Sequence, residues 1–155
     1  MKLIIKYSLF KELKEAANVL LHLDEYKYLR SFILPTPKSI FSFAINKNIA
    51  IKQISKIWTK YQSDITEAFR DLKIKDPGIM PCYLHGMSCQ GWFDIDDNSI
   101  HVRFPDAGGD KELLDTIVHE ILHLATYEDK YSYDEREEMV DKILAKPQFK
   151  KIFSK

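Results

Sequence analysis

The strongest constraint on this 155-residue chain is the apolar run Leu113–Ala125, which contains two histidines and a glutamate. A helix that is apolar on most sides is largely buried. A buried polar side chain without a partner destabilises the fold by roughly 1–3 kcal/mol. We therefore expect His119, Glu120 and His123 to have specific binding partners. The simplest alternative is a pair of core histidines bonded to backbone carbonyls, with Glu120 in an ion pair.

These three residues have the spacing H-E-x-x-H, which suits a metal site. Residues four apart lie on one face of a helix, so the imidazoles of His119 and His123 can converge on one ion. Zinc binds such nitrogens at about 2.0–2.1 Å, and a catalytic zinc needs a third protein ligand and an open position for water. Glu120 points beside the ion, where a general base for that water should stand. We therefore expect one Zn²⁺ per chain.

A second helix follows and is expected to supply the third ligand. Residues 134–144 have helical spacing, with Asp134 as the N-cap and Pro147 at the end of the run. The apolar stripe of this helix consists of Met139, Val140, Ile143 and Leu144.

Glu137 is the best candidate for the third ligand because it borders that stripe, and Glu138, further round the helix, is the alternative. Asp141 lies one turn after Glu137 and could accept the other ring N–H of a ligating histidine. The competing interpretation is an ordinary acidic first turn that favours the helix dipole, and this is what we expect of Glu135.

The pattern H-E-x-x-H followed on a second helix by E-x-x-x-D resembles the gluzincin metallopeptidases. The resemblance implies zinc on His119, His123 and Glu137, catalysis by Glu120, and a supporting role for Asp141 behind a ligand. Only 13 residues separate the second histidine from the glutamate. That spacing is most similar to the small intracellular gluzincins of bacteria and phages, of the ImmA/IrrE-like and SprT-like sort.

The resemblance covers about residues 50–146 and implies an α+β fold with a minimal zincin-like core. The expected order is a packing helix, a short antiparallel sheet, the active-site helix and a glutamate-bearing C-terminal helix. Apolar residues recur at helical spacing from about 49 to 73. A short strand is expected at 81–85, and a hairpin at 91–95 and 99–104.

The strand 99–104 is expected to bind the substrate. Its alternation predicts that Ile100, Val102 and Phe104 face the core and that Ser99, His101 and Arg103 face the other way. In the resembling family the strand before the active-site helix is a sheet edge, which implies a protein or peptide substrate paired along residues 99–104. His101 and Arg103 would then line the cleft. The alternative for both is a solvated strand face.

The pattern as a whole predicts a zinc-dependent metallopeptidase that hydrolyses peptide bonds of a protein substrate. A second donor to the oxyanion is usual in such reactions. The candidates are Tyr127, Tyr131 and Tyr133, between the two helices, and His101. A tyrosine in such a loop more often serves packing.

Two other functions use the same motif. Peptide deformylases, which act on a non-peptide amide, also carry H-E-x-x-H but take their third ligand from an upstream cysteine. Cys89 is upstream, although its setting in 87–91 matches their motif poorly. The third possibility is a binding or regulatory protein on a zincin scaffold.

A separate structural zinc is a further alternative. Cys82, His85 and Cys89 lie close in sequence, and His101 could complete four ligands. The spacing matches no zinc module that we can justify, and the cysteines are more simply explained as small buried residues.

Length and patterning predict one domain, 1–155, with an N-terminal helical layer or lid at 1–45 and a zincin-like catalytic core at 46–147. In the first part, residues 10–33 have helical periodicity, and residues 40–45 read as a strand or a packed loop.

Composition gives the remaining expectations. The 23 basic residues balance the 23 acidic ones, so the chain has no net charge that would attract nucleic acid or a membrane surface. The apolar start is interrupted at once by Lys6, which argues against a signal peptide or a membrane span. Two cysteines without a signal suggest reduced thiols and a cytoplasmic location.

Overall fold

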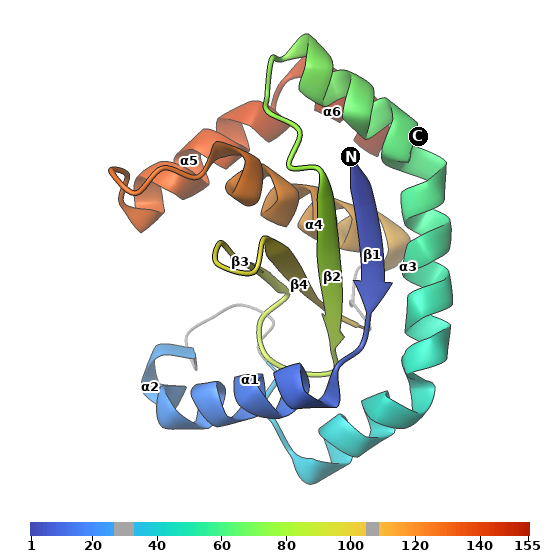
Figure 1. Ribbon diagram of the computed structural model, residues 1–155, viewed down its shortest axis with the longest axis vertical. Helices are drawn as coiled ribbons and strands as arrows, with labels where there is room; N and C mark the ends of the chain where they lie inside the picture. The colour runs from blue at the N-terminus through green and yellow to red at the C-terminus, as the bar shows by residue number, and fades with distance from the viewer. Residues whose placement is uncertain (27–32, 105–108) are drawn as a thin grey trace.

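The computed structural model describes residues 1–26, 33–104 and 109–155 and has a mixed α+β architecture, as expected (Figure 1). The strands are β1 (Lys2–Lys6), β2 (Ile79–His85), β3 (Gly91–Asp94) and β4 (Ser99–Arg103). The helices are α1 (Leu9–Leu21), α2 (Leu23–Tyr26), α3 (Pro37–Asp71), α4 (Gly109–Thr126), α5 (Tyr133–Leu144) and α6 (Pro147–Phe153).

The four strands form one mixed sheet in the order β1-β2-β4-β3. β1 and β4 both pair with β2 in parallel, and only the hairpin of β3 and β4 is antiparallel. The expectation of a short antiparallel sheet was therefore wrong for most of the sheet. Parallel pairs need crossover connections: α1, α2 and α3 lie between β1 and β2, and β3 lies between β2 and β4.

β4 lies inside the sheet, between β2 and β3. The expectation that residues 99–104 form a sheet edge was wrong, because both sides of this strand are already paired. Among the described strands, the edges of the sheet are β1 and β3. Ser99, His101 and Arg103 face away from α4 as expected, but they are buried rather than solvated.

The core lies between one face of the sheet and the helices α3 and α4. Its largest fully buried side chains include Phe69 and Ile54 from α3, Met80 and Leu84 from β2, Ile100 from β4, and Ile117 and Ile121 from α4. Burial at this scale fixes the orientation of α4 and so of its polar residues. No helix in the described part of the chain has both the length and the apolar character needed to cross a bilayer.

α3 begins 12 residues before the expected start at 49. Thr36 and Ser39 form a capping box, and Pro37 occupies the first turn, where a missing N–H has no cost. The segment 40–45 is part of this helix, so its interpretation as a strand or loop was wrong.

The N-terminal third is not a separate helical layer. β1 is a strand of the main sheet, and α3 runs through the expected boundary at 45. The helix expected at 10–33 is interrupted at His22, between α1 and α2, and residues 27–32 lie outside the described residues. α1 crosses the carboxyl end of β2 (Figure 1).

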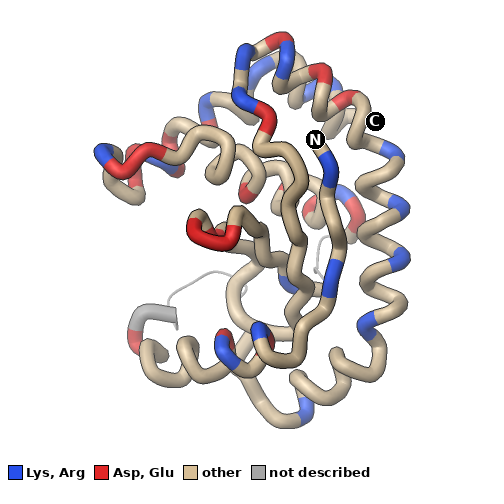
Figure 2. Tube along the Cα trace, in the orientation of Figure 1, with Lys and Arg blue, Asp and Glu red and all other residues tan. Residues whose placement is uncertain are grey.

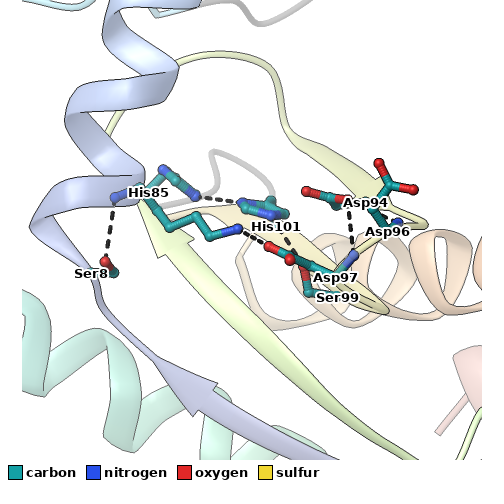
Figure 3. A network of polar contacts seen from close by, with 8 residues as sticks. Ser8, His85, Asp94, Asp96, Asp97, Ser99 and His101 are labelled. Atoms are coloured by element: carbon teal, nitrogen blue, oxygen red, sulfur yellow. Dashed lines mark hydrogen bonds and ion pairs between the residues drawn. The ribbon is translucent and has the colours of Figure 1, made fainter.

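A buried polar chain joins α1 to the sheet. Glu12 of α1 is fully buried, and its Oε2 lies 2.7 Å from His85 Nδ1. His85 Nε2 lies 2.9 Å from His101 Nδ1, and His101 Nε2 lies 3.4 Å from Ser99 Oγ. Figure 3 shows the contacts that lead from His85 through His101 to Ser99. Trp92 stacks on His101 at 4.7 Å between ring centroids.

Burial, followed by the nearby charges of His85 and Lys11, lowers the pKa of His101 to about 3 from an ordinary 6.5. The folded protein therefore holds His101 neutral over a range where the unfolded chain protonates it. Between about pH 6.5 and pH 3 the unfolded state binds more protons, so stability falls as the pH falls through this window.

We expect His101→Asn, which keeps an acceptor near the Nδ1 position but does not titrate, to flatten the acid side of the stability curve. The wild type should lose up to about 1.4 kcal/mol per pH unit more than the variant as the pH falls below 6.5. Urea unfolding at pH 7.5, 6.5, 5.5 and 4.5 measures the two slopes. Equal slopes for both proteins would contradict the assignment.

Candidate metal centre

Two helices bring three potential ligands together. His119 and His123 project from one face of α4, and Glu137 projects from α5. The two Nε2 atoms are 2.9 Å apart. Glu137 Oε2 lies 3.2 Å from His119 Nε2, and Glu137 Oε1 lies 3.1 Å from His123 Nε2. Within the described residues this is the group of His, Cys, Asp and Glu side chains whose geometry could hold a metal ion.

The separations within the cluster are compatible with a tetrahedral ion. Bonds of 2.0–2.1 Å at tetrahedral angles put neighbouring ligand atoms about 3.3 Å apart. The two imidazole nitrogens are 2.9 Å apart, and each lies 3.1 or 3.2 Å from a different carboxylate oxygen of Glu137. Two imidazoles and one carboxylate are also a donor set typical of catalytic zinc. Three protein ligands leave a fourth position for water.

The charges of the cluster agree with this interpretation. Hydrogen bonds from His119 and His123 hold the pKa of Glu137 well below its usual range. Burial opposes protonation of His119, but the hydrogen bond to Glu137 and the charge of Glu120 raise the pKa of His119 overall. A metal ion would replace the protons at these nitrogens, so metal binding should weaken as the pH falls.

Glu120 lies beside the cluster and is almost fully buried. Burial raises the pKa of its carboxyl to about 8. The backbone of β3 runs close by, since a Cβ built on Gly91 would lie 2.9 Å from Glu120 Oε1 and 2.7 Å from Thr116 Cγ2. A carboxyl held in a dry site next to a metal position is suited to exchanging protons with a water there.

The structure separates the three glutamates of α5. Glu138 is exposed and pairs with Lys142 at 2.7 Å, and Glu135 closes the capping box with Ser132 at the helix start. Only Glu137 faces the histidines. The sequence predicts Asp134 as the N-cap of this helix, but the N-cap is Ser132. Among the described residues Asp141 makes no hydrogen bond to either histidine, although its charge contributes to the raised pKa of His119.

Of the expected oxyanion donors, Tyr133 lies one turn before Glu137 on α5. Burial of its hydroxyl, followed by the charges of Glu137 and Glu120, raises the pKa of Tyr133 to about 12. Tyr127 packs edge-on against Phe93, with ring centroids 5.8 Å apart. Lys130 stacks on Tyr131.

His101 lies on the other face of the sheet. His101 and Trp92 pair across β4 and β3 and stack together, whereas Phe93, the next residue along β3, stacks on His123. Successive strand residues point to opposite faces. The structure therefore removes His101 from the residues that could reach a substrate at the metal centre.

The second zinc site has no matching geometry. Cys82 is buried in the main core, on the face of the sheet opposite to His85 and His101. Cys89 directs its thiol to the Gly91 carbonyl at 3.4 Å, and burial raises its pKa to about 11. Neither thiol joins a metal-binding group among the described residues.

Two residues of β3 complete the site and were missed in the sequence. Phe93 stacks on His123 with ring centroids 5.0 Å apart and planes at 15°. Gly91 lets the strand approach Glu120. A glycine at a strand start can signal a close backbone approach, but nothing local in the sequence identifies what lies opposite.

Searches of protein-family models, curated proteins and solved structures found no match to this chain. The geometry of the cluster and its surroundings is what marks this site as a candidate metal centre.

We expect the wild type, purified without added metal, to carry one zinc per chain by elemental analysis. His119→Ala and Glu137→Ala each remove a ligand and should weaken zinc binding by roughly 100-fold or more. Glu138→Ala is the matched control and should retain the metal. Zinc that survives both ligand changes, or that is lost equally in Glu138→Ala, would contradict this site.

Proposed function

We propose that this protein is a zinc-dependent metallopeptidase with a zincin-like core. The observation that carries the proposal is the convergence of His119, His123 and Glu137 within 2.9–3.2 Å of one another, with buried Glu120 beside them. The order of elements from α3 to α5 also supports it, because a packing helix, a sheet, the H-E-x-x-H helix and the glutamate helix follow in sequence.

When bound, zinc would supply a Lewis acid that polarises the peptide carbonyl and lowers the pKa of a water in its open position. Glu120 would take a proton from the attacking water and return it to the leaving amine as the amide C–N bond breaks. The raised pKa of Glu120 suits a group that must both accept and release a proton near neutral pH.

The substrate is proposed to pair along β3 rather than β4. β3 is an edge strand, and its face toward α4 carries Gly91 and Phe93, next to Glu120 and His123. An extended peptide added to this edge gains main-chain hydrogen bonds with few sequence demands. Its carbonyls would pass beside the metal position.

The surroundings of β3 are acidic (Figure 2). Asp94 ends β3, Asp96 and Asp97 lie in the turn after it, and Glu128 and Asp129 follow α4. Phe93 of β3 packs on Tyr127 with ring centroids 5.8 Å apart, so the end of β3 and the loop after α4 lie near each other. Lys11 pairs with Asp97 and Lys130 pairs with Glu128, so the excess negative charge here comes from Asp94, Asp96 and Asp129. This charge repels acidic peptides and supports a substrate segment with Lys or Arg near the cleaved bond.

We expect Glu120→Gln to keep its zinc and lose roughly 10²–10⁴-fold in turnover, because the amide has the same shape but exchanges no proton. Cleavage of a peptide library, with new termini identified by mass spectrometry, measures turnover. Glu138→Gln is the control. Full activity in Glu120→Gln would contradict the mechanism, and a zinc-bound wild type that cleaves no peptide would favour a binding protein instead.

We expect Tyr133→Phe to lower kcat by roughly 10²-fold with unchanged zinc content, because a donor near the metal position stabilises the oxyanion. Tyr131→Phe, which removes a hydroxyl from the same loop region, should retain kcat. The same library assay with purified cleaved sequences gives kcat and KM for both. Equal values in the two variants would remove Tyr133 from the mechanism.

A further inference from the structure

α1 has an unusual distribution of side chains for a surface helix. The residues that it buries are Glu12, Ala16 and Val19. Its large apolar side chains instead face outward, with Phe10 75 % exposed and Leu21 80 % exposed. A surface helix ordinarily buries its apolar stripe and exposes its charges.

The exposed apolar residues of α1 form one continuous face. At 100° per residue, the positions of Leu9, Leu13, Leu20, Phe10 and Leu21 fall within an arc of about 120°. Ala17 lies in the middle of the same arc and no charged residue falls inside it. We call these six residues the α1 face.

The start of α3 carries a second exposed stripe. Phe41, Ile45 and Ile49 follow each other at intervals of four residues and are 63 %, 79 % and 62 % exposed. α1 and the first turns of α3 lie at the same end of the molecule, away from α5 and α6 (Figure 1). Ala16 of α1 and Ile40 of α3 pack in one small cluster with Met87, so the two helices are in contact.

We propose that the α1 face and this stripe form the interface between two copies of the chain. The exposed fractions of the eight large apolar residues correspond to an area on the order of 900 Å² in total. That area is close to the roughly 800 Å² that each partner contributes to a standard stable interface.

A second copy is also compatible with the charges. In a two-fold interface the same patch meets itself, so any charge in its centre would be opposed by a like charge. The α1 face has none. Homodimer interfaces are more apolar than the rest of the surface, as this end of the molecule is. α5 and the metal cluster lie away from the interface and remain accessible in the dimer.

The buried side of α1 links the interface to the candidate active site. Glu12 Oε1 accepts a hydrogen bond from Gly86 N at 3.0 Å, and Glu15 Oε1 accepts one from Ser88 Oγ at 2.7 Å. Both partners lie in the connection from β2 to β3, which leads to Gly91. The dimer would thus hold α1, and through it this connection, in place.

Sedimentation velocity of the full-length chain from about 1 to 200 µM tests the proposal. We expect the wild type to approach twice the monomer mass as concentration rises. Phe10→Gln with Leu21→Gln alters two of the most exposed residues of the α1 face, so the fold should persist by circular dichroism. The dissociation constant should rise on the order of 100-fold.

Ile79→Gln with Ile95→Gln is the matched control, since both isoleucines are exposed and lie outside the interface. This pair should dimerise like the wild type. A wild type that stays monomeric at 200 µM would overturn the proposal and leave the face to a different partner. An unchanged dissociation constant in the variant with Phe10→Gln and Leu21→Gln would overturn it as well. Loss of the dimer in the control alone would place the interface elsewhere and would also overturn it.

Discussion

The close passage of β3 over α4 is the contact on which the site depends. Gly91 allows the strand to lie against Thr116 and Glu120, and the Phe93 ring then stacks on His123. One short strand therefore confines the proposed base and one potential ligand. Because side chains alternate along a strand, the same β3 sends Trp92 to the opposite face, where it stacks on His101. The cluster of His119, His123 and Glu137 and the buried polar chain that holds α1 thus both depend on β3.

The sequence predicts the elements that depend on local patterns. α4, α5 and the hairpin of β3 and β4 are found close to their expected bounds, since helical periodicity and turn residues act over a few positions. Long-range pairing is not visible in this way. β1 is only five residues long and reads as an apolar start, and its parallel partner lies more than 70 residues away. The segment 40–45 has β-branched and aromatic residues that favour a strand, but the cap at Thr36 and the burial of Ile40 and Phe43 at helical spacing decide for α3.

For the candidate site, too, the sequence predicts the residues that belong to local patterns but not those that depend on the packing of the sheet. H-E-x-x-H and the phase of the following helix identify His119, His123 and Glu137, and the structure brings them together. The choice between Glu137 and Glu138 depended on how α5 packs. The expected place of His101 beside the cleft is wrong because its strand lies inside the sheet. The sequence does not reveal Gly91 and Phe93 because only the folded sheet places them beside α4. Equal totals of basic and acidic residues also say nothing of where the charges lie. In the fold, lysines follow α3 and acidic residues gather near β3 (Figure 2).

The position of β1 has a consequence for how the molecule folds. Lys2 pairs with Ile79, so the first strand to be synthesised has no partner until α3 and the whole of β2 have followed. Closing so long a loop lowers the conformational entropy of the chain before the hydrogen bonds between the strands can form. Such non-local contacts slow folding. Leu3, Ile4 and Ile5 remain without strand partners during that interval, although β1 is synthesised before the other strands of the sheet.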